Sequence, residues 1–203
     1  MRFHPKYVQI IGDAVIPVLG FLWWNWNVYF IILFYFLDIL VKEVVLHFKS
    51  KKINSFGKEN HQTEQTIDWI KLGGISLVLI GITVFIVQKI MPFILPAFNA
   101  IDELSKFWNY KDMGIEQGYI LVPLVILMGY LQYKNEFILP KIYEKITISH
   151  LWKKHLKAYI VLLAFTAFTF GLVQFISISE GILVIGIITL SSAYQWYELK
   201  RSN

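Results

Sequence analysis

Six segments of this chain are apolar over nearly the whole length that an α-helix needs to cross a lipid bilayer, about 20 residues. A soluble domain of 203 residues lacks the interior to hide them, because 56% of its residues are hydrophobic and only 16% are charged. Lipid therefore has to cover the excess apolar surface. The sequence predicts an all-α, polytopic transmembrane helical bundle that forms a single domain over residues 1–203, with spans at about 7–23, 27–48, 68–91, 118–135, 157–178 and 181–198.

The basic residues predict an orientation. If the N-terminus is cytoplasmic, the cytoplasmic termini and loops hold 16 of the 19 Lys and Arg residues, and the outer side keeps Lys89, Lys106 and Lys111. Cytoplasmic loops of membrane proteins carry such an excess. Frequent Ile, Lys, Asn and Phe are typical of an AT-rich bacterial genome. We expect both termini inside, in a bacterial inner (cytoplasmic) membrane, and we assign the net charge of +5 to insertion rather than to nucleic-acid binding.

Several kinds of chemistry are missing from the sequence. The absence of Cys excludes disulfides, thiolate metal sites and cysteine nucleophiles. The chain has no HExxH pair and no GxSxG turn, so we expect no catalytic residue, no bound metal and no cofactor. Of the five His residues, only His47 is expected near a span. The other four are expected in termini or loops: His4, His61, His150 and His155.

Ionisable residues within the first two spans are the candidate site. A charged side chain near the bilayer centre costs about 2.5–3.5 kcal/mol on insertion scales, so such residues usually face the bundle interior and find partners. If the short WWNWN segment turns the chain back on itself, Asp13 lies level with Asp38. Tyr35 and Lys42 then lie one turn to either side of Asp38. Glu43 forms a second pair with His47, on a different face of the same helix.

This cluster has two alternative interpretations. Two carboxylates and one ammonium leave a surplus negative charge, which a proton or a cation would neutralise. Pro17 also frees a backbone carbonyl close to Asp13, as in the broken helices of some ion sites. The candidates for a cation or proton site are therefore Asp13, Asp38, Lys42, Tyr35 and Glu43. Alternatively, Asp38 and Lys42 form a plain structural pair that orients the hairpin, and Asp13 is hydrated.

Two connecting segments have amphipathic patterns. In the outer segment 97–113, Phe98, Ile101, Leu104 and Trp108 recur at helical spacing, which predicts either an interfacial helix or a cap over a cavity. The inner loop between Pro140 and Lys157 is basic and favours anionic lipid headgroups. Its candidate headgroup ligands are Lys153, Lys154 and Lys157.

Small residues in the fifth span indicate a helix–helix contact. Ala164, Ala167 and Gly171 form a patch in which the last two are one turn apart. Small residues at this spacing let two transmembrane helices approach closely.

The first hairpin resembles the DUF6498 type, a family of uncharacterised bacterial and archaeal integral membrane proteins. The resemblance covers about residues 10–48 and rests on Pro17 and Gly20 in the first span, the Trp-rich turn at 23–26, and Tyr35 with an acidic residue in the second span. Asp38 is a departure, because the family is associated with Glu at that position. The resemblance implies a membrane hairpin and no activity.

These features lead to one function and two alternatives. We expect a small transporter-like protein with an intramembrane cation or proton site. The first alternative is a structural or accessory subunit of a membrane protein complex. The second is a lipid-binding or lipid-modifying protein that acts at the basic inner loop. The expected partners are the lipid bilayer and either another membrane protein or a second copy of the chain, with no nucleic acid.

Overall fold

The computed structural model describes residues 5–59, 66–109, 111–112 and 115–202 of the chain. Arg2, one of the basic residues that predict the orientation, and His4 and His61 lie outside them. The described elements are almost entirely helical, which confirms the all-α class. The helices are α1 (Pro5–Trp23), α2 (Val28–Glu59), α3 (Thr66–Ile94), α4 (Ala100–Asn109), α5 (Gln117–Tyr133), α6 (Ile148–Val173) and α7 (Glu180–Ser202).

Short elements connect these helices at two places. The antiparallel strands β1 (Lys111–Asp112) and β2 (Ile115–Glu116) lie between α4 and α5. The π-helix η1 (Lys134–Ile138) extends α5, and the 3-10 turn η2 (Ile142–Glu144) precedes α6. Lys141 begins this turn in the left-handed region at φ 54°.

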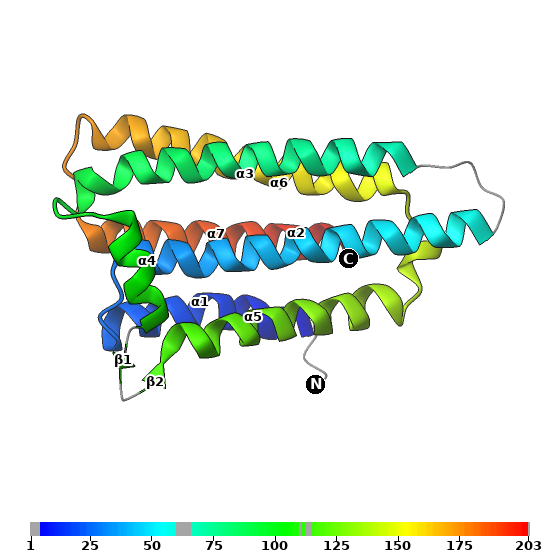
Figure 1. Ribbon diagram of the computed structural model, residues 1–203, viewed down its shortest axis with the longest axis horizontal. Helices are drawn as coiled ribbons and strands as arrows, with labels where there is room; N and C mark the ends of the chain where they lie inside the picture. Colours follow the sequence, from blue (N-terminus) through cyan, green and yellow to red (C-terminus); the bar gives the residue numbers. More distant parts are fainter. Residues whose placement is uncertain (1–4, 60–65, 110, 113–114, 203) are drawn as a thin grey trace.

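The long helices lie side by side along one axis (Figure 1). They pack as three principal pairs, α3 with α6, α2 with α5, and α1 with α7, and α2 also contacts α1, α3, α6 and α7. The connections from α1 to α2, from α3 to α5 and from α6 to α7 lie at one end of the bundle (Figure 1). We call it the turn end, and we call the opposite end, where α2 finishes and α6 begins, the loop end. The central helix α2 thus faces every other long helix.

The turn between α1 and α2 is closed by backbone geometry and by one close ring contact. The Trp26 N–H donates to the Gly20 carbonyl at 2.9 Å, and Asn25 adopts a positive φ of 50°. The Trp26 ring lies so close to Gly20 that an added Cβ would be 2.3 Å from it. Asn27 then caps α2, because its Oδ1 accepts from the Phe30 N–H at 2.9 Å.

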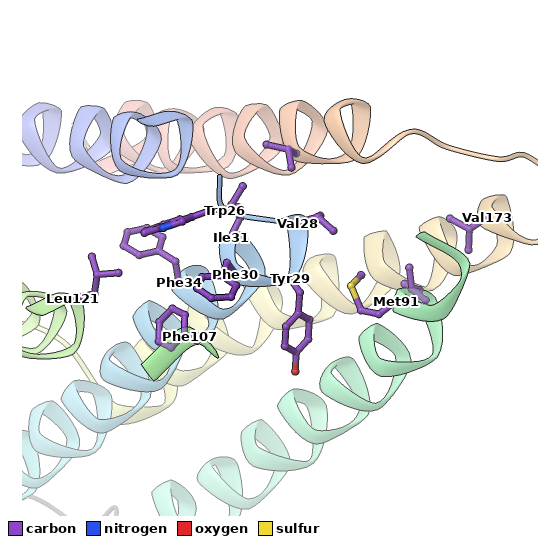
Figure 2. Close-up of a cluster of buried hydrophobic side chains, with 12 residues drawn as sticks. Trp26, Val28, Tyr29, Phe30, Ile31, Phe34, Met91, Phe107, Leu121 and Val173 are labelled. Atoms are coloured by element: carbon purple, nitrogen blue, oxygen red, sulfur yellow. The ribbon is translucent and has the colours of Figure 1, made fainter. Parts of the chain in front are cut away.

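Two apolar clusters hold the bundle together. The larger one gathers at the turn end, where Trp26, Phe30 and Phe34 of the α1–α2 hairpin meet Phe107 of α4 and Leu121 of α5 (Figure 2). The smaller one lies toward the loop end. It joins Leu46 and Ile53 of α2, Phe137 of η1, and Ile148 and Trp152 of α6. Each cluster combines residues from helices that are distant in the sequence.

Helices α2 and α6 differ from the predicted spans. Helix α2 continues to Glu59, eleven residues beyond the predicted end at 48, and α6 occupies Ile148–Val173 instead of 157–178. Hydropathy detects only the apolar part of a helix, whereas Lys and Glu also favour helical structure. Thr147 fixes the start of α6, since its side chain accepts from the His150 N–H. The predicted basic loop is therefore in part the first two turns of α6.

The helix predicted in the outer segment exists as α4, but its buried face is not the apolar one. Glu103 and Phe107 are buried, while Ile101 is 78% exposed and Leu104 is 45% exposed. Phe98, which precedes the helix, does pack inward, against Tyr29. The orientation of α4 is fixed by a hydrogen bond. Glu103 accepts it from Asn27 at the start of α2, so the face of α4 that carries Glu103 points toward the bundle. Helix α4 therefore covers the turn end of the bundle.

Two of the described helices are long and apolar enough to cross a membrane. They are α3, over Trp69–Ile94, and α6, over Ile148–Val173. Both also have largely exposed side chains, since only 17% of the most apolar window of each is buried.

Candidate functional site

The polar residues of α2 divide into two clusters on different faces of the helix. We define the first cluster as Asp13 of α1, Tyr35, Asp38 and Lys42 of α2, and Gln195 of α7. We define the second cluster as Glu43 of α2, Ser76 of α3, and His155 and Tyr159 of α6. Lys42 and Glu43 are adjacent in the sequence, so their side chains point about 100° apart around the helix. This divergence places one cluster against α1 and α7 and the other against α3 and α6.

In the first cluster, Pro17 determines the contact between α1 and α2. A proline has no N–H, so Pro17 leaves the carbonyl of Asp13 without its helical partner. The Tyr35 hydroxyl donates to that carbonyl at 3.0 Å. Pro17 is itself fully buried. The carbonyl freed by proline thus receives its hydrogen bond from the neighbouring helix.

The charged groups of the first cluster have partners of two kinds. The Lys42 ammonium donates to the Asp38 carboxylate at 2.5 Å. The Asp13 carboxylate accepts a hydrogen bond of 2.9 Å from the amide of Gln195. Asp13 also lies close enough to Asp38 and Lys42 for their charges to act on it. The structure thus brings Asp13, Tyr35, Asp38 and Lys42 together, and one of the two carboxylates has a neutral hydrogen-bond donor.

The second cluster is built around a buried carboxylate. The Glu43 Oε2 atom accepts from the Ser76 hydroxyl at 2.8 Å and from the Tyr159 hydroxyl at 3.1 Å. The His155 Nε2 atom lies 3.3 Å from the same oxygen and 2.8 Å from the Tyr159 hydroxyl. Glu43 was predicted as a member of the same site as Asp38. It instead links α2 to α3 and α6.

One oxygen of Glu43 has no hydrogen-bond donor. Its Oε1 atom is buried and has no hydrogen-bond partner, and His47 Nδ1 lies 3.8 Å from it. His47 Nδ1 lies 3.0 Å from the backbone carbonyl of Glu43, and the His47 ring packs edge-on to Trp152. Trp152 in turn donates to Ser50 of α2 at 2.9 Å. These contacts fix the second cluster against the smaller apolar cluster.

Sequence reasoning missed four residues of these clusters: Gln195, Ser76, His155 and Tyr159. Three of them carry no charge, and uncharged polar side chains are common in apolar helices. His155 was expected in a loop, which is wrong, because α6 begins seven residues before it. The spacing of His155 and Tyr159 was an available signal, since residues four apart share one helix face.

The three lysines predicted to bind lipid headgroups lie near the start of α6. Lys153, Lys154 and Lys157 are all exposed in the first turns of this helix. They belong to the loop end of the bundle, far along α6 from its connection to α7 (Figure 1).

A third polar group caps the positive end of α2. The Glu180 carboxylate accepts from the Val28 N–H at 2.7 Å, and Glu103 accepts from the Asn27 amide at 2.7 Å. Lys106 donates to the other oxygen of Glu103, also at 2.7 Å. Burial opposes the charge of Glu103, but the hydrogen bonds from Lys106 and Asn27 outweigh it and hold the pKa of Glu103 below its usual value. Both carboxylates lie where the helix dipole favours negative charge.

The space inside the bundle limits what can bind. A cavity of about 20 Å³ lies beside Tyr159, between α2, α3 and α6. A volume of this size holds about one water molecule. Among the described residues, no group of three or more His, Asp or Glu side chains is placed to hold a metal ion.

Comparisons of the chain with protein-family models, with curated proteins and with solved structures give no match. The resemblance of the first hairpin to the DUF6498 type has no support from them and stays a prediction.

Proposed function

We propose that the chain is a multi-pass membrane protein in which α1, α2, α3, α5, α6 and α7 all cross the bilayer. The distribution of side chains supports this proposal. Large apolar residues such as Phe85, Phe168 and Ile185 are exposed on the bundle surface, whereas Glu43 and Ser76 are buried inside it. A soluble bundle rarely exposes so many large apolar side chains. The basic residues favour cytoplasmic termini, in a bacterial inner membrane.

We further propose that the first cluster binds or relays a proton or a small cation, in a transporter-like role. The observation that carries this proposal is the charge count around Asp13. Asp13 and Asp38 share one ammonium, that of Lys42, and the hydrogen-bond donor on Asp13 is the neutral amide of Gln195. A surplus negative charge within a span is costly unless a proton or cation neutralises it.

The position of the cluster fits such a role. Asp38 is ten residues from the first residue of α2, so it lies roughly 15 Å along the helix at about 1.5 Å per residue. That is about half the thickness of the hydrocarbon core. The cluster joins α1, α2 and α7, because Tyr35 of α2 and Gln195 of α7 both donate a hydrogen bond to Asp13 of α1. Neutralising Asp13 would change the attraction among these three helices, and so couple ion binding to helix packing.

Flux measurements in proteoliposomes test this function. We expect the wild-type chain to move protons, sodium or potassium down an imposed gradient, and Asp38→Asn to abolish that movement. Lys89→Gln is the matched control, because Lys89 lies on the exposed surface of α3. Absence of wild-type flux for all three ions would overturn the ion-transport proposal, and so would full flux in Asp38→Asn.

One observation favours the accessory-subunit alternative. Ala164 and Ala167 are exposed, and nothing lies within 4 Å of a Cβ built on Gly171. The described part of the chain therefore does not make the close helix contact that these residues predict, and a partner helix has access to them. Native mass spectrometry after gentle solubilisation tests this alternative. A stable heteromeric mass that Ala167→Leu abolishes would support it, and a monomer alone would contradict it.

A further inference from the structure

The second cluster contains a continuous chain of hydrogen-bonding groups that ends on a buried carboxylate. Tyr159 has a single hydroxyl proton, and it donates that proton to Glu43 Oε2 at 3.1 Å. Its oxygen is then free to accept from His155 Nε2, which lies 2.8 Å away. The donors therefore run in one direction, from imidazole to phenol to carboxylate. Ser76 adds a second fixed donor to the same carboxylate oxygen.

The second oxygen of Glu43 has room for one more hydrogen-bond partner. Oε1 is buried without a hydrogen-bond donor, and buried polar atoms are rarely left in that state. The donors that Oε2 receives are neutral hydroxyls, apart from the imidazole of His155. An ionised carboxylate in a span therefore depends on a nearby imidazolium for its charge balance, or it takes up a proton itself.

Exposure rises stepwise from Glu43 toward the surface. The Glu43 side chain is 6% exposed, His155 is 19% exposed and His47 is 37% exposed. His47 follows Asp38 by more than two turns of α2, and His155 precedes Tyr159 in α6, which begins at the loop end. Both imidazoles therefore lie toward the loop end. His is the side chain whose ordinary proton affinity suits exchange with water near neutral pH. The two histidines are thus placed between the buried carboxylate and the loop end.

We propose that Glu43, Tyr159 and His155 form a second proton-binding site, distinct from the first cluster, which exchanges its proton with the loop end of the bundle. A proton arrives at His155 Nδ1 as the Nε2–H bond breaks. The Nε2 proton passes to the Tyr159 oxygen, and the Tyr159 hydroxyl proton passes to Glu43. His155 and Tyr159 end with the number of protons they had at the start, and Glu43 has gained one.

The surrounding groups define what else acts on this site. The titratable side chains that face Glu43 are His155 and Tyr159 from α6 and His47 from α2, and α3 brings the neutral Ser76. Asp38 of the first cluster acts on Tyr159 through its charge. Placing the loop end in the cytoplasm rests on the proposed membrane orientation. The existence of the site rests on these contacts alone.

Equilibrium titration of the full chain in lipid nanodiscs tests the proposal without any transport measurement. The ring nitrogens of ¹⁵N-labelled His155, assigned with His155→Gln, report proton binding, and the ¹³C-labelled carboxyl carbon of Glu43 reports its ionisation. In the wild type we expect both signals to move with a common midpoint, because one proton is shared along the chain of groups. Separate and independent midpoints would overturn the proposal.

Matched variants sharpen the titration. We expect Glu43→Gln to weaken proton binding at His155 about tenfold, because it removes a negative charge at short range while keeping an acceptor for Ser76 and Tyr159. Asp102→Asn, an exposed change on α4 at the turn end, is the control and should leave that affinity nearly unchanged. An unaltered His155 in Glu43→Gln, or an equal change in Asp102→Asn, would overturn the proposal. If Glu43→Gln does not fold, the wild-type midpoints still decide.

The outcomes separate this site from the transport function. If the wild type shows no ion flux but Glu43 and His155 titrate with a common midpoint, the proposed function is overturned and the site remains. Intact flux that depends on Asp38, with uncoupled Glu43 and His155 signals, would remove the site and leave the function.

Discussion

The hydroxyl of Tyr35 donates a hydrogen bond of 3.0 Å to the backbone carbonyl of Asp13, the carbonyl that Pro17 deprives of its helical donor. A side chain of α2 thereby replaces the hydrogen bond that is missing within α1. The same bond brings the Asp13 backbone to the helix that carries Asp38. Pro17, Tyr35 and Asp13 therefore form one structural unit that joins α1 to α2.

Tyr35→Phe should lower the free energy of unfolding by about 1 kcal/mol, because it leaves a part-buried carbonyl without a donor. Denaturant unfolding in detergent or bicelles measures the change. Pro17→Ala restores an N–H to α1, so in that background Tyr35→Phe should cost less. Equal costs of Tyr35→Phe in both backgrounds would show that the proline has no part in this contact.

Lys42→Met should destabilise the chain by about 1–3 kcal/mol, since it leaves the Asp38 carboxylate without its ammonium. The pair is partly exposed, with 34% of Lys42 and 20% of Asp38 accessible, so we expect less than for a fully buried pair. The double variant Asp38→Asn with Lys42→Met should recover most of the loss. Unfolding curves that show additive losses in the double variant would contradict the pairing.

Gly20→Ala should destabilise the α1–α2 hairpin by about 1–3 kcal/mol, because the new methyl group would overlap the Trp26 ring. Gly12→Ala in the same helix is the matched control. Its Cβ would meet nothing within 4 Å, and alanine favours the helix by up to about 1 kcal/mol. Thermal unfolding compares the two variants. Equal effects would mean that the contact of Gly20 with Trp26 contributes nothing specific.

Acidification should loosen α4 before it affects the rest of the bundle. The pKa of Glu103 in the folded chain lies below its ordinary value of 4.5, so its contribution to stability is full above about pH 4.5. That contribution is lost as the pH falls through the folded pKa. Hydrogen exchange of the α4 amides against pH measures the effect. Glu103→Gln should exchange faster at neutral pH and show a weaker pH dependence, and a profile like that of the wild type would contradict this assignment.

Lys153→Gln combined with Lys157→Gln should reduce the anionic lipid that copurifies with the chain. Both side chains are exposed at the start of α6, and each basic residue near a membrane surface adds about 1 kcal/mol of attraction to anionic lipid. Lys89→Gln is the control, because Lys89 is also exposed but lies on α3 near the turn end of the bundle. Quantitative lipid analysis should find less anionic lipid only in the first variant, and equal retention would contradict headgroup binding at this end.

The long helices were predictable from the sequence because each contains a long run of apolar residues. The same dependence on apolar residues explains which helix ends were predicted wrongly. The apolar pattern missed the last eleven residues of α2 and the first nine of α6, since those turns are basic and polar. It predicted a helix in the segment of α4 but not the burial of Glu103, because periodicity shows which residues share a face and not what that face meets. Asn27, the partner that turns Glu103 inward, is 76 residues away.

The candidate site shows the same division. Local spacing along α2 was enough to relate Asp38 to Lys42, and a short turn was enough to place Asp13 at a similar level. Gln195 and Ser76 depend on how distant helices pack, and no local pattern marks them. Helical spacing alone placed Glu43 on a different face of α2 from Asp38, but its partners on α3 and α6 followed only from the packing of those helices.

The two clusters on α2 have a mechanical consequence. Tyr35 on one face of α2 is hydrogen-bonded to Asp13 of α1, and Glu43 on another face is hydrogen-bonded to Ser76 of α3 and Tyr159 of α6. A small rotation of α2 about its own axis therefore cannot relax one set of contacts without straining the other. Helix α2 is shared by the two halves of the bundle. A change in its contacts with α1 and α7 would therefore also change its contacts with α3 and α6.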